Sequence, residues 1–179
     1  RLESAGPAGK EEVVDVSGLL TAAKKSYSGQ DDVAGIEVMA ESTAQLLAAG
    51  NEVESLISNL LSNAVRHTPA DGRITLAWRV DPDGAEIVVT DTGEGIPADQ
   101  VPRLTERFFR VHRGRAREDG GVGLGLAIVK KLVEEHGGRV EASNAEAGGA
   151  RIAILLPIHD VSMAAPSGAD VRAREYKGE

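Results

Sequence analysis

The stretch VESLISNLLSNAVRH, residues 53–67, has the most regular pattern in the sequence. Its apolar residues recur at intervals of three and four, which predicts an amphipathic helix with one buried face. The opposite face carries two carboxamides and a guanidinium in one row, from Asn59, Asn63 and Arg66. Carboxamide oxygens can ligate a hard cation and a guanidinium can bind phosphate oxygens, so this row suits a Mg²⁺–triphosphate. The alternative is an ordinary solvated face, although asparagine is a poor helix former.

Two segments downstream of this helix predict β-hairpins. Residues 73–80 alternate between apolar and polar side chains, and DPDG at 81–84 supplies a turn before the apolar run that ends at Asp91. The stretches 138–143 and 148–157 predict a second hairpin near the C-terminal end of the sequence.

Shorter elements are expected nearer the N-terminus. Residues 13–16 predict a strand, followed by a helix that Ser17 caps and that continues to about Ser28. Residues 35–41 and 44–50 predict two short strands around a turn.

Composition sets the class of protein. The 179 residues suffice for one domain, and aromatic residues make up only 3%, so the core must consist of aliphatic side chains. The formal net charge of −8 argues against nucleic acid or an anionic membrane surface as the main partner. Because there is no cysteine, disulfides and cysteine-ligated metals are excluded.

A glycine-rich stretch precedes a second predicted helix. GGVGLGLAIVKK, residues 120–131, leads into an amphipathic pattern over 124–136 that Gly137 and Gly138 end. Glycines at the start of a helix are typical of phosphate sites. The sequence G-x-x-x-x-G-K-[ST] of a P-loop does not occur, and the stretch does not match the dinucleotide fingerprint G-x-G-x-x-G, because Leu126 occupies its last glycine position. A loop without a ligand is the alternative.

The stretch DTGEGI, residues 91–96, places a carboxylate at the end of an apolar strand. Asp91 needs a hydrogen-bond donor there, and the 6-amino group of adenine is one. A hydrogen bond to a charged group contributes about 1.5–3 kcal/mol, which would select adenine over bases without the amine. Gly93 and Gly95 would let the backbone approach a flat base. A tight turn capped by the aspartate is the alternative.

The stretch PRLTERFFRVHRGRARE, residues 102–118, is an arginine-rich island in an acidic protein, and it contains Phe108 and Phe109. A mobile segment with cations and an aromatic anchor suits a lid over nucleotide phosphates. The alternative is a solvated run of charges beside a packed phenylalanine pair.

In their order along the chain, these stretches resemble the catalytic ATP-binding (HATPase) domain of the sensor histidine kinases of two-component systems. RLTERFFRV is especially similar to the phosphate-regulon sensor kinases. The resemblance covers about residues 12–157. It rests on four motifs: NLLSNAVRHTP (59–69) resembles the N box, DTGEGIP (91–97) the G1 box, RFFRV (107–111) the F box and GGVGLGLAIVKKLVEEHGG (120–138) the G2 box.

Helices that alternate with hairpins predict a two-layer α/β sandwich with a mixed sheet. The resemblance implies the Bergerat (GHKL ATPase) type of this fold, with the helices on one face of the sheet and a flexible ATP lid. We expect residues 1–11 to be a linker remnant from a missing dimerisation and phosphoacceptor hairpin. Residues 12–158 are expected to form the catalytic ATP-binding domain, and residues 159–179 a flexible C-terminal tail.

The resemblance also implies roles for individual residues. Asp91 would bind the adenine amino group, and Asn63 would be the main Mg²⁺ ligand with Asn59 nearby. The glycine-rich stretches and the first phenylalanine would complete the nucleotide contacts, through Gly93, Gly95, Ile96, Phe108, Gly121, Val122, Gly123, Leu124, Gly125 and Leu126.

The resemblance implies that cationic side chains meet the phosphates. Arg66 and His67 would approach them, and Arg110 in the lid would reach the γ-phosphate, so that Asn59, Arg66 and Arg110 form the expected catalytic set. Two positions depart from the family: Arg66 occupies a position where lysine is frequent, and Ala150 one where threonine is common, which removes a hydroxyl from the adenine region.

The expected activity is transfer of the γ-phosphoryl group of ATP to a histidine. ATPases of this fold carry a glutamate as general base where this sequence has Asn59, and a carboxamide cannot take that proton. None of the four histidines has the context of a phosphoacceptor, so we expect Mg-ATP binding without self-phosphorylation. A module that binds ATP as a regulatory ligand and an anti-sigma serine kinase are the alternatives.

The resemblance further implies the setting of the domain. ATP and ADP, the absent acceptor hairpin and a response regulator are the expected partners, and nucleic acid is not. The fragment is expected to be a monomer and the full protein a homodimer, with this domain in the cytoplasm as part of a membrane sensor protein.

Overall fold

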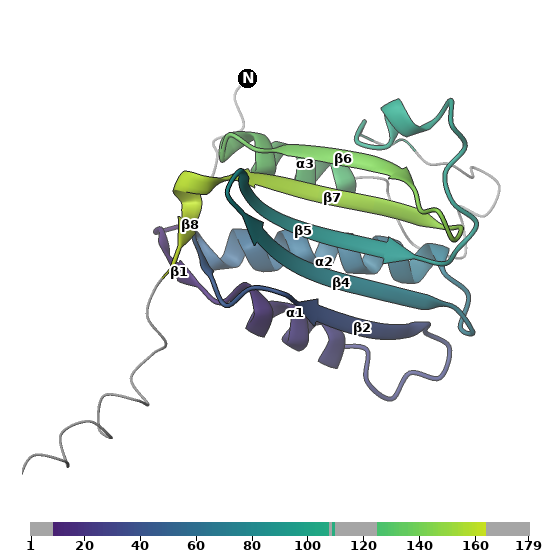
Figure 1. The fold of residues 1–179 in the computed structure, drawn as a ribbon. Coiled ribbons are helices and arrows are strands. Elements are labelled where there is room, and N and C mark those ends of the chain that lie inside the picture. The colour runs from purple at the N-terminus through teal and green to yellow at the C-terminus, as the bar shows by residue number, and fades with distance from the viewer. Residues whose placement is uncertain (1–8, 108, 110–124, 164–179) are drawn as a thin grey trace, which may run out of the picture.

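The computed structural model describes residues 9–107, 109 and 125–163. Its centre is a five-stranded sheet in the order β2-β4-β5-β7-β6, with the helices on one face (Figure 1). Strand β2 runs parallel to β4 and the other neighbours are antiparallel, so the predicted two-layer sandwich with a mixed sheet is confirmed. The strands are β2 (Gly35–Ala40), β4 (Arg73–Asp81), β5 (Gly84–Asp91), β6 (Arg139–Asn144) and β7 (Ala150–Pro157), and the helices are α1 (Val16–Lys25), α2 (Gly50–His67) and α3 (Gly125–Glu135).

Helix α2 lies in the middle of the helical layer, and its apolar face supplies a large part of the core. Leu60 and Leu61 are each 1% exposed, and Trp78 on the facing strand β4 is completely buried. The indole Nε1 of Trp78 donates a hydrogen bond of 3.1 Å to the carbonyl oxygen of Ala44, so its one polar group is satisfied. The helix predicted from residues 53–67 is confirmed and begins one turn earlier.

Both predicted hairpins are confirmed. At the β4–β5 turn, the Asp81 carboxylate accepts hydrogen bonds from the backbone N–H groups of Asp83 and Gly84, at 2.8 and 3.1 Å. At the β6–β7 turn, Gly148 and Gly149 have φ angles of +91° and +88°. Only glycine adopts these angles without strain, so the glycine pair fixes this turn.

Helix α3 ends where the sequence predicts. Gly137 has a φ of +75°, the Gly138 N–H donates to the carbonyl of Val133, and the Gly137 N–H donates to that of Glu134. These bonds form a Schellman motif. His136 Nε2 lies 3.1 Å from Glu52 Oε2, which joins the end of α3 to the first turn of α2.

The start of α1 differs from the prediction. Asp15, not Ser17, is the N-cap residue, because its carboxylate accepts a hydrogen bond of 3.1 Å from the Gly18 N–H. Val16 is completely buried in the first turn, so the helix begins before Ser17. The helix also ends at Lys25, three residues short of the predicted Ser28.

The two strands predicted around a turn do not pair with each other. Strand β2 joins the main sheet, whereas β3 (Gln45–Ala48) lies in a second sheet of order β1-β3-β8. Strand β1 (Glu12–Val14) and β8 (Val161–Ser162) flank β3. The fold therefore includes residues beyond 158, where the sequence predicts a flexible tail from residue 159.

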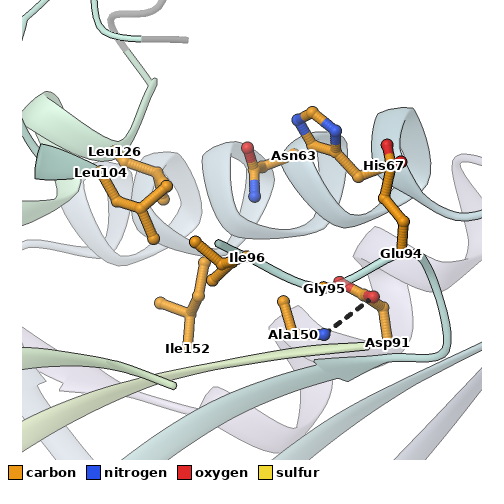
Figure 2. A pocket seen from close by; sticks show the side chains of 10 residues that line it. All are labelled: Asn63, His67, Asp91, Glu94, Gly95, Ile96, Leu104, Leu126, Ala150 and Ile152. Carbon is orange, nitrogen blue, oxygen red and sulfur yellow. Dashed lines mark hydrogen bonds between the residues drawn. The ribbon is translucent and has the colours of Figure 1, made fainter. Parts of the chain in front are cut away.

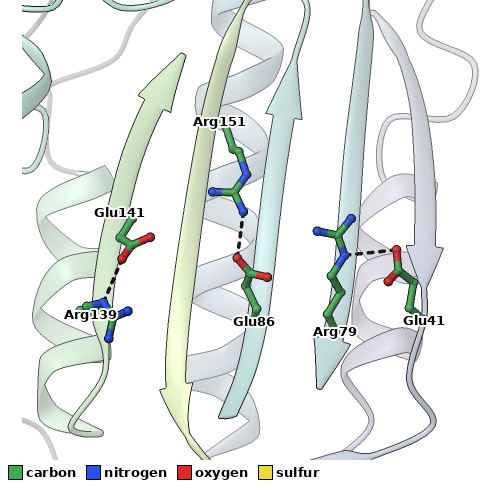
Figure 3. A network of polar contacts seen from close by, with 6 residues as sticks. All are labelled: Glu41, Arg79, Glu86, Arg139, Glu141 and Arg151. Atoms are coloured by element: carbon green, nitrogen blue, oxygen red, sulfur yellow. Dashed lines mark hydrogen bonds and ion pairs between the residues drawn. The ribbon is translucent and has the colours of Figure 1, made fainter. Parts of the chain in front are cut away.

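The sheet face away from the helices carries several pairs of oppositely charged side chains (Figure 3). Arg151 reaches Glu86 at 2.9 Å, and the register of β5 and β7 places the buried pair Val88 and Ala153 between them. The methylene groups of Arg151 therefore pass over this small apolar pair and shield it. Further ion pairs on this face include Arg79–Glu41 at 3.1 Å and Arg139–Glu141 at 2.9 Å.

No helix within the described ranges has both the length and the apolar character needed to cross a membrane.

The glycine pair of the β6–β7 turn allows a matched test of the fold. A side chain at Gly149 would overlap the carbonyl oxygen of Asp91, whereas one at Gly148 would meet nothing within 4 Å. We expect Gly148→Ala to lose about 1–2 kcal/mol of unfolding free energy from backbone conformation alone. Gly149→Ala should lose roughly twice as much, because backbone must also move. Urea unfolding measures both, and equal losses would contradict the contact with Asp91.

Candidate functional site

A pocket lies between α2, the end of β5 and the start of β7 (Figure 2). About 430 Å³ of space in and at the mouth of this pocket is free of protein atoms, part of it open to solvent. One wall is apolar and the other carries polar side chains from α2. The residues that line it are Asn63, His67, Asp91, Glu94, Gly95, Ile96, Leu104, Leu126, Ala150 and Ile152.

Asp91 lies on the sheet side of this pocket and is only 5% exposed. Its Oδ1 accepts hydrogen bonds from the backbone N–H groups of Gly93, at 2.8 Å, and Ala150, at 3.2 Å. Both of these hydrogen bonds from described residues go to Oδ1, and neither goes to Oδ2. One oxygen therefore caps the turn, and the other can accept a hydrogen bond from a ligand. The turn and the ligand interpretations of Asp91 are compatible.

The glycines after Asp91 are required by the protein itself. A side chain at Gly93 would overlap the carbonyl oxygen of His67, at the end of α2. Gly95 has a φ of +77°, and a Cβ there would lie 2.8 Å from Oδ1 of Asn144. The sequence leads us to expect both glycines for the approach of a flat base. In the structure, neighbouring protein atoms already leave too little room for a side chain at either position. Gly95 lines the pocket, whereas Gly93 does not.

Asn144 holds the loop that follows Asp91, and no pattern in the sequence reveals this role. Its Oδ1 accepts from the Ile96 N–H at 2.7 Å, and its Nδ2 donates to the Ile96 carbonyl at 2.8 Å. The two residues are 48 positions apart, and no spacing pattern in the sequence connects them. The lining residues Glu94, Leu104 and Ile152 are likewise not predicted, since nothing local distinguishes them from other loop and strand residues.

The polar face of α2 contributes two side chains to the pocket. Asn63 and His67 line the pocket, and Figure 2 shows both projecting from the helix. Asn59 lies one turn away, where its Nδ2 donates to the Ser55 carbonyl at 2.8 Å. Its Oδ1 lies 3.1 Å from the position of a Cβ built on Gly125. The amide oxygen of Asn59 therefore faces the first residue of α3.

The structure brings six predicted site residues into one pocket and leaves others outside it. Arg66 is exposed and does not line the pocket. Phe109, next to the predicted Phe108, contacts the Arg103 guanidinium, which lies 4.5 Å from the ring centroid. The residues brought together are Asn63, His67, Asp91, Gly95, Ile96 and Leu126, and those outside the described residues are Phe108, Arg110, Gly121, Val122, Gly123 and Leu124.

Comparison with known proteins identifies the family of this chain. The family model described as histidine kinase-, DNA gyrase B-, and HSP90-like ATPase matches residues 49–160. The phosphate regulon sensor protein PhoR of Pseudomonas aeruginosa is 46% identical over 109 residues, which are 61% of this chain and 25% of that protein. The sensor-like histidine kinase SenX3 of Mycolicibacterium smegmatis is 32% identical over 159 residues, 88% of this chain and 41% of that protein. The chain thus spans less than half of each relative.

Solved structures agree with these relatives. The mycobacterial sensor histidine kinase MprB superposes with a TM-score of 0.72 at 32% identity, over 82% of this chain and 97% of that one. Full-length ShkA, solved in complex with AMPPNP, has a TM-score of 0.74 at 28% identity, over 90% of this chain and 33% of that one. The chain belongs to the family of histidine kinase-, DNA gyrase B- and HSP90-like ATPases, and within it to the ATP-binding domains of sensor histidine kinases.

Proposed function

We propose that this chain binds Mg-ATP in the pocket beside Asp91 and presents the γ-phosphate to a histidine of a separate phosphoacceptor domain. The observation that carries the proposal is the Asp91 carboxylate, fixed through Oδ1 by two backbone donors while Oδ2 can accept from a ligand. A 6-amino group is the complementary donor on adenine. The complex of the related ShkA with AMPPNP supports an adenine nucleotide as the ligand.

The triphosphate is proposed to extend from Asp91 toward the start of α3. Asn59 and Gly125 lie at that end, and a helix N-terminus favours negative charge. Arg66 and His67 are the proposed phosphate contacts from α2. We further assign Arg110 to the γ-phosphate, and the glycines 121, 123 and 125 to the phosphate chain; apart from Gly125, these lie outside the described residues.

The donor set on α2 fits a magnesium ion that arrives with the nucleotide. Asn63 lines the pocket, and the Asn59 amide is oriented by Ser55 so that Oδ1 is the outward atom. Oxygen ligands are what Mg²⁺ prefers, and it usually binds through one or two protein groups plus phosphates. Within the described ranges, no cluster of three His, Asp or Glu side chains could hold a metal by itself. When bound, the ion would neutralise charge on the phosphate oxygens.

Phosphoryl transfer to a protein is favoured over hydrolysis. Asn59 has no proton-accepting group near neutral pH, so it cannot act as the general base that activates water. The residues of this chain would then act by positioning the triphosphate and compensating its charge. In the full-length protein we propose a cytoplasmic location, a homodimer, and a response regulator as the next acceptor; the fragment alone is proposed to be a monomer.

Replacing Asp91 by Asn tests the base contact. The Asn Oδ1 can keep both backbone hydrogen bonds, so Nδ2 would take the place of Oδ2 and face the adenine amine with a donor. ATP affinity should fall roughly ten- to a hundredfold, whereas ITP, which has a 6-oxo group, should lose little. Calorimetric titration with both nucleotides measures this, and thermal unfolding controls for the fold. An equal loss for ATP and ITP would contradict the assignment.

Replacing Asn63 by Ala tests the metal contact. In the unaltered protein, Mg²⁺ should strengthen ATP binding, and the variant should lose about 10–100-fold of that metal dependence. Titrations with Mg²⁺ and with EDTA give the comparison. Ser58→Ala, at an exposed position of the same helix, is the control and should behave like the unaltered protein. A full Mg²⁺ effect in the Asn63 variant would remove this residue from the site.

Radiolabelled ATP tests the reaction. The purified chain alone should take up no stoichiometric label, and mixing it with a separately produced acceptor hairpin of a sensor kinase should label the hairpin. Phosphohistidine is lost in acid and phosphoserine survives, so acid treatment separates a histidine kinase from a serine kinase. ATP binding without any transfer would instead favour a module that uses ATP as a regulatory ligand.

A further inference from the structure

The loop that follows β5 is attached at both of its ends to the hairpin of β6 and β7. At the start of the loop, the Ala150 N–H donates to Asp91 Oδ1 at 3.2 Å. At the end of the loop, the Asn144 amide accepts from the Ile96 N–H at 2.7 Å and donates to the Ile96 carbonyl at 2.8 Å. Asn144 and Ala150 lie opposite each other in the register of β6 and β7. One cross-strand pair therefore holds both ends of the loop.

The end of this loop is a wall between two hollows. Ile96 is only 7% exposed and lines the pocket beside Asp91 together with Ile152 (Figure 2). A second hollow is lined by the same three loop residues, Glu94, Gly95 and Ile96, and also by Asn144. A segment with space on both sides is held in place by its attachments more than by close packing. The position of Ile96 therefore depends on the Asn144 amide.

The chemistry of asparagine suits this attachment. Its amide carries an acceptor and donors on one short side chain, and the backbone of Ile96 offers one N–H and one carbonyl. Two bonds from one planar group fix both the position and the orientation of Ile96. Gly95 leaves the room for this approach, because a Cβ there would lie 2.8 Å from Asn144 Oδ1.

We propose that Asn144 is a positioning residue for the nucleotide: by holding Ile96 it keeps this wall of the pocket in the conformation that binds the base, and thereby sets the affinity for ATP. This inference rests on the proposed function, because it takes the ligand to be an adenine nucleotide. A wall that is fixed before the ligand arrives loses less conformational freedom on binding. Without the anchor, the free chain would hold the binding conformation only part of the time, and the apparent affinity would fall by that fraction.

Replacing Asn144 by Ala removes both bonds to Ile96. The side chain of Asn144 is exposed, so the packing of the core stays as it is. In calorimetric titrations with Mg²⁺, the affinity for ATP should fall roughly 3- to 30-fold. In hydrogen exchange followed by NMR, the Ile96 N–H should exchange about tenfold faster or more, whereas that of Ile87, in the middle of the sheet, should keep its rate. Ser143→Ala, at the neighbouring exposed position, is the control and should change neither quantity.

Replacing Asn144 by Asp separates a two-bond anchor from a simple cap of the Ile96 N–H. The carboxylate still accepts from that N–H, but it has no donor for the Ile96 carbonyl and places a negative oxygen beside it. At neutral pH the affinity for ATP should therefore fall by about threefold or more. A smaller loss would overturn the two-bond anchor.

The exchange rates and the titrations together decide the role of Asn144. Faster exchange at Ile96 without a loss of ATP affinity would overturn the proposal, because Asn144 would then support only the loop. An unchanged rate at Ile96 would overturn it as well, and so would faster exchange at Ile87, since Asn144 would then support the whole sheet. If the unaltered chain did not bind ATP, the proposed function itself would fail, and this inference with it.

Discussion

The Asp91 carboxylate joins the loop that directly follows it to the start of β7, which is 59 positions away in the sequence. Through one oxygen it accepts hydrogen bonds from the loop that follows β5 and from the first residue of β7. Gly149 lies against its backbone so closely that no side chain fits between them. The loop after Asp91 is then held by Asn144, from the end of β6. Remove this carboxylate and the wall of the pocket loses the bonds that align it, whatever ligand the pocket holds.

Local patterns predict most of the fold, because the elements concerned are set by neighbours in the sequence. The apolar spacing of α2, the turn at Asp81 and the glycines after α3 each act within a few residues. Pairing between distant segments is different. Strand β2 joins β4 in parallel across an intervening helix, and nothing in residues 35–41 encodes that partner. The predicted cap of α1 is wrong because Asp15 and Ser17 are both good caps, and the burial of Val16 decides between them.

For the site, residue chemistry predicts the functional groups better than their supports. Asp91 and Asn63 can be singled out from the sequence because each is unfavourable where it stands. A carboxylate after an apolar strand needs a hydrogen-bond donor, and asparagine is a poor helix former. Asn144 cannot be singled out in this way, because asparagine is common next to turns. Gly93 is a third case. The sequence correctly singles out this glycine but does not predict why it is needed, which is that the carbonyl of His67 leaves no room for a side chain.

The ion pairs on the outer face of the sheet also bear on whether two such sheets can stack face to face. Sheets stack when their exposed faces are apolar and interdigitate. Here Val88 and Ala153 lie beneath the methylene groups of Arg151, whose guanidinium pairs with Glu86. Face-to-face stacking would require those charges to give up water without gaining new partners, which is unfavourable. The Arg151–Glu86 pair therefore disfavours face-to-face stacking over this part of β5 and β7.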